Sequence, residues 1–207
     1  MMSLWSPHSH APEPDGGAWR LVNYMIARRV SKKIGSRVVR IERSPAPEVL
    51  RGDPDLVRRA IAALPYKHRY SAVTLSFAEH DIPVPAFNVA GPARDRAGRI
   101  LELFFETAYP GIEPEARPPI LASTHVHMGR VEINIALPRA VLRPDGQLRS
   151  YNPHPKRRKS AELWQGHCQV ILAPSELGEL LSGQASQVPI SAAYPSQRLT
   201  ASARAWR

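Results

Sequence analysis

Residues 118–138, PPILASTHVHMGRVEINIALP, carry most of the information about the fold and its function. Folded as a β-hairpin about Met128-Gly129, this stretch places His125 directly opposite Glu132 and Ser123 opposite Asn134. Glycine at the second turn position suits the positive φ of a tight hairpin turn. Cross-strand partners share a face of a sheet, as do residues two apart along one strand. The register therefore predicts one polar and one apolar face.

The polar face of this hairpin carries candidate metal ligands. It holds His125, His127, Glu132 and Asn134, whereas valine and isoleucine side chains make up the opposite, core-forming face. One imidazole, one carboxylate and one amide oxygen suit a divalent cation such as Mg²⁺ or Mn²⁺, and they do not suit a structural zinc site. A cation held in this way leaves coordination positions for phosphate oxygens. The alternative is an ordinary polar, solvent-facing side of a hairpin.

Composition points to an anionic partner. The 207 residues fit one domain, or one domain plus a tail. Lys+Arg minus Asp+Glu is 28 − 18 = +10, which favours nucleic acid over a merely basic soluble protein. Cys168 is alone, so no intrachain disulfide framework is expected and a reducing cytoplasm is the default location. No apolar run of about 18 residues predicts a membrane span, and the N-terminus lacks the pattern of a secretory signal.

Hydrophobic periodicity predicts an α+β fold with a central antiparallel sheet flanked by helices. We expect a disordered arm over 1–17, a folded domain over 18–167, and a tail of uncertain structure over 168–207. Within the folded domain we expect helices over 18–33, from Asp53 to Leu64 and over 98–109, and strands over 37–43 and 70–77, besides the hairpin.

Tyr24 is the candidate nucleophile. On the helix predicted over 18–33, positions 20, 24 and 28 lie on one face, so Tyr24 is expected between Arg20 and Arg28. Neighbouring positive charge favours the phenolate, which is the nucleophilic form. The alternative is a tyrosine that only packs.

The sequence resembles a family at this point. Residues 52–78, GDPDLVRRAIAALPYKHRYSAVTLSFA, resemble a segment of the plasmid mobilisation relaxases of the MOBP type. The hairpin is similar to their third motif in the subclass that uses His, Glu and Asn, with Glu132 seven residues after His125 and Asn134 two further on. Tyr24, within RLVNYMI, matches their catalytic tyrosine. The resemblance covers roughly 18–155. His127 is additional to the pattern, either as a group behind the ligands or as an alternative ligand.

The resemblance implies a palm-like fold shared with HUH relaxases and replication initiators. It also implies a metal-dependent endonuclease and transesterase that nicks one DNA strand at a plasmid transfer origin through a 5′-phosphotyrosyl intermediate. Expected partners are single-stranded and duplex DNA, with accessory mobilisation proteins and a coupling protein as further candidates. The expected DNA contacts are the following residues: Arg20, Arg28, Lys67, His68, Arg69 and Ser76. Tyr66, Tyr70 and Tyr151 are candidate stacking platforms, and His68 or His127 a candidate base.

Three other functions remain open. They are a catalytically inactive remnant of a relaxase, decayed or truncated, that binds DNA; a metal-dependent phosphodiesterase that uses water; and a replication initiator with the same fold. The last is disfavoured because the initiator tyrosine normally follows the metal motif in sequence.

Overall fold

A five-stranded antiparallel sheet organises the computed structural model, which describes residues 2–6, 16–126, 129–153, 164 and 168. Its strand order is β1-β5-β7-β6-β4, and every neighbouring pair is antiparallel. The strands are β1 (Met2–Ser6), β4 (Val49–Arg51), β5 (Tyr70–Ser76), β6 (Leu121–His125) and β7 (Glu132–Pro138).

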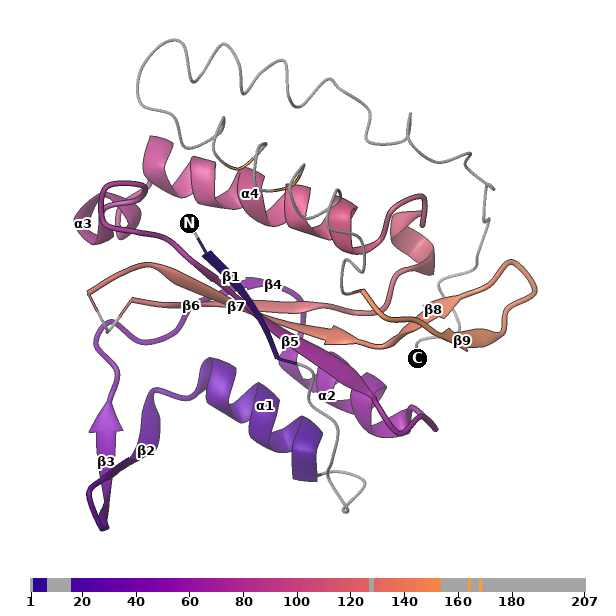
Figure 1. The fold of residues 1–207 in the computed structure, drawn as a ribbon, viewed down its shortest axis with the longest axis horizontal. Coiled ribbons are helices and arrows are strands. Elements are labelled where there is room, and N and C mark those ends of the chain that lie inside the picture. The colour runs from indigo at the N-terminus through magenta and orange to yellow at the C-terminus, as the bar shows by residue number, and fades with distance from the viewer. Residues whose placement is uncertain (1, 7–15, 127–128, 154–163, 165–167, 169–207) are drawn as a thin grey trace.

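Helices cover both faces of this sheet (Figure 1). The helices α1 (Gly16–Ile26) and α2 (Pro54–Ala63) lie against one face, and the longer α4 (Pro92–Ala108) lies against the other. Two shorter helical turns, α3 (Val84–Phe87) and η1 (Pro114–Ala116), flank α4 in the sequence. The predicted class, an α+β fold with a central antiparallel sheet and flanking helices, is confirmed.

The face under α4 is the main hydrophobic core. Val73, Leu75, Ile133 and Ile135 of the central strands are at most 1% exposed and pack with the apolar stripe of α4. The helix spans more than the predicted 98–109, because Pro92 stands at its first turn, where a missing N–H costs no hydrogen bond. Trp164 and Cys168 are also buried in this core.

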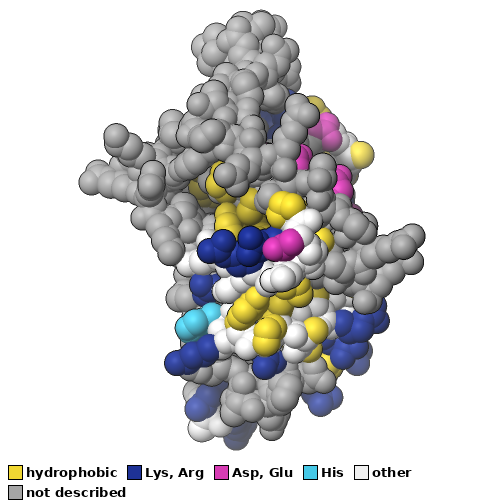
Figure 2. Space-filling view, turned by 90° about the vertical axis from the view of Figure 1, so that its right-hand side faces the viewer, with side chains coloured by type: hydrophobic (Ala, Val, Ile, Leu, Met, Phe, Trp, Pro, Cys, Tyr) yellow, Lys and Arg dark blue, Asp and Glu magenta, His cyan; other side chains and the backbone are white. Residues whose placement is uncertain are grey.

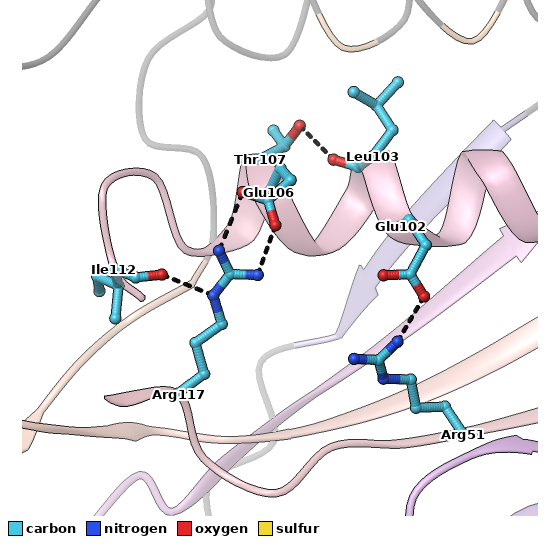
Figure 3. A network of polar contacts seen from close by, with 7 residues as sticks. All are labelled: Arg51, Glu102, Leu103, Glu106, Thr107, Ile112 and Arg117. Carbon is cyan, nitrogen blue, oxygen red and sulfur yellow. Dashed lines mark hydrogen bonds and ion pairs between the residues drawn. The ribbon is translucent and has the colours of Figure 1, made fainter. Parts of the chain in front are cut away.

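Ion pairs along the C-terminal half of α4 tie it to its neighbours (Figure 3). Arg51 of β4 donates to Glu102 at 2.6 Å. Arg117 contacts both carboxylate oxygens of Glu106, at 2.7 and 3.0 Å, and its Nε donates to the Ile112 carbonyl at 2.7 Å. The second set closes the turn between α4 and β6, whereas the first links the helix to the edge strand β4.

The N-terminus of α2 follows its sequence signals. Asp53 caps the helix by accepting from the backbone N–H groups of Asp55 and Leu56. These bonds, chiefly that from Leu56, hold the pKa of the Asp53 carboxyl below its ordinary value. Gly52 has φ of 86°, and a Cβ there would stand 1.9 Å from the Ile120 carbonyl oxygen. Glycine is therefore required where this turn passes β6.

The predicted helix over 18–33 is wrong at its C-terminal end. The helix α1 stops at Ile26, and the chain continues into a two-stranded ribbon of β2 (Arg29–Ile34) and β3 (Arg37–Glu42). Gly35, with φ of 60°, makes the turn between them. This ribbon projects from the body of the molecule beside the end of α1 (Figure 1). A second ribbon, β8 (Ala140–Leu142) with β9 (Leu148–Ser150), lies at the other end of the sheet.

The predicted disordered arm is also corrected in part. Residues 2–6 form the edge strand β1, which pairs with β5 along its whole length. Residues 7–15, most of the basic stretch 153–160, and the tail over 169–207 lie outside the described residues. Among the described helices, none has both the length and the apolar character needed to cross a membrane.

Candidate active site

Two rows of polar residues cross β6, β7 and β5 on the sheet face under α1. In the first row His125 is opposite Glu132, which is opposite Ser76. In the second row Ser123 is opposite Asn134, which is opposite Thr74. The predicted register of the hairpin is therefore confirmed for both pairs. Because residues two apart share a face, all six side chains lie on one side.

These rows are mostly buried, which is unusual for polar side chains. Ser123, His125, Asn134 and Ser76 are buried, whereas Glu132 is partly exposed at the end of β7. Buried polar groups require hydrogen-bond partners, and for Ser123 and His125 the partner is a backbone carbonyl at the C-terminal end of α1.

The last turn of α1 docks on the polar rows through the Met25 carbonyl. Ser123 Oγ donates to this oxygen at 2.9 Å, and His125 Nε2 lies 3.1 Å from it. The last carbonyls of a helix have no partner within the helix, so the sheet supplies one. A carbonyl only accepts, so this contact assigns the His125 proton to Nε2 and the lone pair of the neutral ring to Nδ1.

Tyr24 stands at the solvent edge of the same rows. Its side chain is 50% exposed, whereas Val22 and Met25 on the opposite side of α1 are buried. The Tyr24 and His125 rings meet edge to face, with centroids 5.2 Å apart and an interplanar angle of 71°. The structure thus brings the predicted nucleophile against the first predicted metal ligand, although they are about 100 positions apart in the chain.

The three predicted ligands lie on one face, and their chemistry fits a hard divalent cation. The tautomer of His125 leaves the Nδ1 lone pair for coordination, and a ligating histidine commonly donates its other N–H to a backbone carbonyl. Glu132 Oε1 is 2.7 Å from both Nε and Nη2 of the exposed Arg130. Within the described residues, no group of three or more His, Cys, Asp and Glu side chains gathers at one place, so a cation bound here would need the Asn134 amide oxygen beside His125 and Glu132.

Asn134 can present its oxygen after a flip of its amide. In the assigned orientation of the amide, Thr74 Oγ1 donates to Asn134 Oδ1 at 2.8 Å, and the buried Asn134 Nδ2 has no hydrogen-bond partner among the described residues. Oxygen and nitrogen of an amide are assigned from such networks. Exchanging them lets Nδ2 donate to the Thr74 hydroxyl and places the oxygen where Nδ2 now stands unpartnered.

The arginines predicted to flank Tyr24 are placed differently from one another. Arg20 is exposed on α1, one turn before Tyr24, as expected. Arg28 lies beyond the end of the helix and pairs with Glu42 at 2.7 Å, so the predicted place of Tyr24 between Arg20 and Arg28 on one helix face is wrong. The positive charge beside the ring comes from Arg43, whose guanidinium carbon is 4.6 Å from the ring centroid. No local pattern in the sequence indicates this contact.

The other predicted DNA contacts divide between the two ends of the sheet. Ser76 is in the first polar row, opposite Glu132. Lys67, His68 and Arg69 precede Tyr70, at the opposite end of β5 and roughly 20 Å away along the strand. His68 is thus too far from Tyr24 to act as its base. Basic side chains are also seen around apolar ones on the side of the molecule that Figure 2 shows.

The three candidate stacking tyrosines have structural contacts instead. Tyr66 donates to the Leu148 carbonyl at 3.1 Å, and Tyr151 stacks on Tyr109 with centroids 5.4 Å apart. Tyr70 is half-buried against the α1–α2 cluster, and burial raises the pKa of its phenol. His127, the additional histidine, lies outside the described residues.

Comparison with known proteins gives one relevant match. Over 150 residues, 72% of this chain, the sequence is 26% identical to the DNA relaxase MbeA of Escherichia coli. The chain is similar to a DNA relaxase. It covers only 24% of the length of that relative. No family model matches the sequence, and no solved structure matches it.

Proposed function

We propose that this protein nicks one strand of DNA at a plasmid transfer origin, with Tyr24 as the nucleophile. The observation that carries the proposal is the edge-to-face contact of Tyr24 with His125, on the sheet face that also bears Glu132 and Asn134. The similarity to a DNA relaxase supports the same reaction. The more specific relationship, to the His/Glu/Asn subclass of MOBP relaxases, rests on the spacing of these residues.

The proposed reaction is a transesterification. The Tyr24 hydroxyl oxygen attacks the scissile phosphorus, and its proton passes to solvent or a nearby base. A bond forms between the phenolic oxygen and phosphorus while the bond from phosphorus to the 3′ oxygen breaks. The 3′ oxygen takes up a proton and leaves as a hydroxyl. The phosphodiester becomes a 5′-phosphotyrosyl linkage, so the reverse attack by a 3′-hydroxyl can religate a strand.

A divalent cation, Mg²⁺ or Mn²⁺, held by His125, Glu132 and Asn134 would neutralise charge on the non-bridging phosphate oxygens. The chain's own residues prepare that site. The Met25 carbonyl, which also accepts from Ser123 Oγ, orients the His125 ring through Nε2. Arg130 pairs with Oε1 of Glu132 at the rim and would compete with the cation for that oxygen.

The β2–β3 ribbon is the surface best suited to hold DNA next to Tyr24. It follows α1 directly in the chain and carries exposed basic side chains. These are Arg29, Lys33, Arg37 and Arg40. The major groove of DNA admits a two-stranded ribbon. We expect the double variant Arg37→Gln/Arg40→Gln to weaken binding across all sequences and to lower the salt dependence by about one unit of slope per lost phosphate contact.

The test is a nicking assay on supercoiled DNA that carries a cognate transfer origin, with Mg²⁺ or Mn²⁺. Nicking with protein trapped on the 5′ end, lost in Tyr24→Phe but with DNA binding retained, is the expected result. Binding without nicking by the wild-type chain would instead identify a DNA-binding remnant of a relaxase. Nicking that persists in Tyr24→Phe and is lost in His125→Ala would identify a phosphodiesterase that uses water.

A further inference from the structure

Arg43 is a buried arginine at the junction of the ribbon and the polar rows. It follows β3 directly, and its backbone N–H donates to the Arg28 carbonyl at 2.7 Å. The residue is only 1% exposed. Arginine is almost never fully buried unless it is paired. Its contacts therefore indicate what the position is used for.

The guanidinium of Arg43 grips the last turn of α1. Its Nη1 donates to the Tyr24 carbonyl at 2.6 Å and to the Ala27 carbonyl at 3.1 Å. Positive charge near a helix C-terminus is favourable because the helix dipole is negative there. Together with the contacts to the Met25 carbonyl, Arg43 fixes where the helix ends.

The same guanidinium also contacts the Tyr24 ring, 4.6 Å from its centroid. The ring therefore has a cation on it from the ribbon side and the His125 imidazole against it from the sheet side. Although half of Tyr24 is exposed to solvent, its ring has contacts that restrict its direction.

The charge of Arg43 is not explained by an ion pair. Within the described part of the chain, no carboxylate pairs with it, and its buried Nε has no hydrogen-bond partner. Nearby, Glu42 pairs with the exposed Arg28 and Arg29 instead. Burial, the largest cause, lowers the pKa of the Arg43 guanidinium, while the Tyr24 side chain acts in the opposite direction. Burying a charge without a carboxylate partner is costly, so stability alone is a poor reason for this residue.

We propose that Arg43 is a positioning residue for Tyr24, which it holds against His125 by clamping the last turn of α1 and covering the ring with its guanidinium. The consequence for catalysis rests on the proposed nucleophilic role of Tyr24. An error of about 1 Å in the placement of a reacting group can cost on the order of 100-fold in rate. A lysine cannot replace the arginine fully, because it lacks the planar group that stacks on a ring.

The position of the ring is tested directly by NMR on the full chain without DNA or metal. With ring-labelled tyrosine and histidine, the wild type should give a nuclear Overhauser effect between the Tyr24 and His125 rings, assigned by its loss in Tyr24→Phe. We expect this signal to disappear in Arg43→Gln, to weaken in Arg43→Lys, and to persist in Arg99→Gln, an exposed arginine of α4 on the other side of the sheet. A signal unchanged in both Arg43 variants would overturn the proposal.

The functional arm uses single-turnover cleavage of an origin oligonucleotide. Arg43→Gln should cleave on the order of 100-fold more slowly while its affinity for DNA stays within about threefold of the wild type, and Arg43→Lys should recover part of the rate. Equal rates with a lost ring contact would also contradict the proposal. If the wild type forms no covalent product, the proposed function fails, yet the ring contact still decides whether Arg43 positions Tyr24. Arg43→Lys keeps a donor for the helix carbonyls, so this variant carries both measurements if Arg43→Gln does not fold.

Discussion

The two faces of the central sheet are built from the same strands but differ in chemistry. Under α4, residues such as Leu75 and Ile133 make a dry apolar core. Under α1, their neighbours Thr74 and Asn134 make a buried polar row, and the apolar cluster with α1 and α2 is smaller. One sheet therefore serves two purposes: the α4 face stabilises the fold by burying apolar side chains, and the α1 face holds the polar side chains of the proposed active site.

The first way to test this division is to remove a core side chain from the α4 face. Phe104 is 1% exposed and contacts both Phe105 and Trp164. Phe104→Ala should lower the free energy of unfolding by about 3–5 kcal/mol, because it leaves a cavity in a packed core. Chemical denaturation measures this loss. A loss below about 1 kcal/mol would show that the α4 face is not the main source of stability.

The second test replaces one carboxylate by an amide on each side of the sheet. Glu132→Gln should weaken Mn²⁺ binding on the order of 100-fold, because it removes the charged ligand of the proposed metal site. It should change the free energy of unfolding by less than about 0.5 kcal/mol, because the ion pair of Glu132 with Arg130 is at the surface. Calorimetric titration with Mn²⁺ measures the affinity.

Glu106→Gln is the matched control, because Glu106 also pairs with an arginine but on α4. It should leave Mn²⁺ affinity unchanged. Equal losses of affinity in both variants would remove Glu132 from the proposed metal site.

The apolar pattern and the hairpin register could be predicted from the sequence because both are local. A side-chain period of two and a glycine turn fix which residues share a face, so His125 and Glu132 are found together. Asp53 and Pro54 likewise mark the start of α2. The pairing of β1 with β5 is a long-range contact, and nothing in residues 1–6 alone indicates it.

The predicted C-terminal end of α1 is wrong although the sequence contains a signal for the turn that follows the helix. Gly35-Ser36 separates two segments in which Val30 and Ile34, then Val39 and Ile41, stand among basic residues, and a two-residue turn with glycine is typical of a hairpin. Continuing the helix through this segment placed Arg28 beside Tyr24. In the structure Arg43 lies beside Tyr24, because the β2–β3 ribbon brings the chain back to the end of α1. A helix continued to residue 33 does not allow this return.

A third test compares one hydroxyl on each face. Ser123 Oγ, fully buried, donates to the Met25 carbonyl, whereas Thr107 Oγ1 donates to Leu103 within α4. Ser123→Ala should lower the free energy of unfolding by about 1–2 kcal/mol, because it leaves a buried acceptor with fewer donors. Thr107→Ala should cost less than about 0.5 kcal/mol. Thermal unfolding measures the loss of stability in each variant. Equal losses in the two variants would mean that the docking of α1 does not depend on the bond from Ser123 to the Met25 carbonyl.

The smallest expected effect concerns Cys168, which is buried on the α4 face. Burial raises the pKa of its thiol to about 12, so the native thiol stays protonated at pH 8 and should resist a thiol reagent until the protein unfolds. The thiol of an unfolded chain has a pKa of about 8.5. The contribution of Cys168 to stability is therefore complete below that pH and is lost as the pH rises toward 12. Rapid labelling of the native protein would contradict this burial.

The measurement that tests the central claim most directly is tandem mass spectrometry of the covalent product formed with a single-stranded origin oligonucleotide and Mn²⁺. We expect a 5′-phosphonucleotide attached to Tyr24 in the wild type, none in Tyr24→Phe, and far less in Glu132→Gln. An adduct on a different tyrosine, or cleaved DNA with no adduct at all, would contradict the role assigned to this residue.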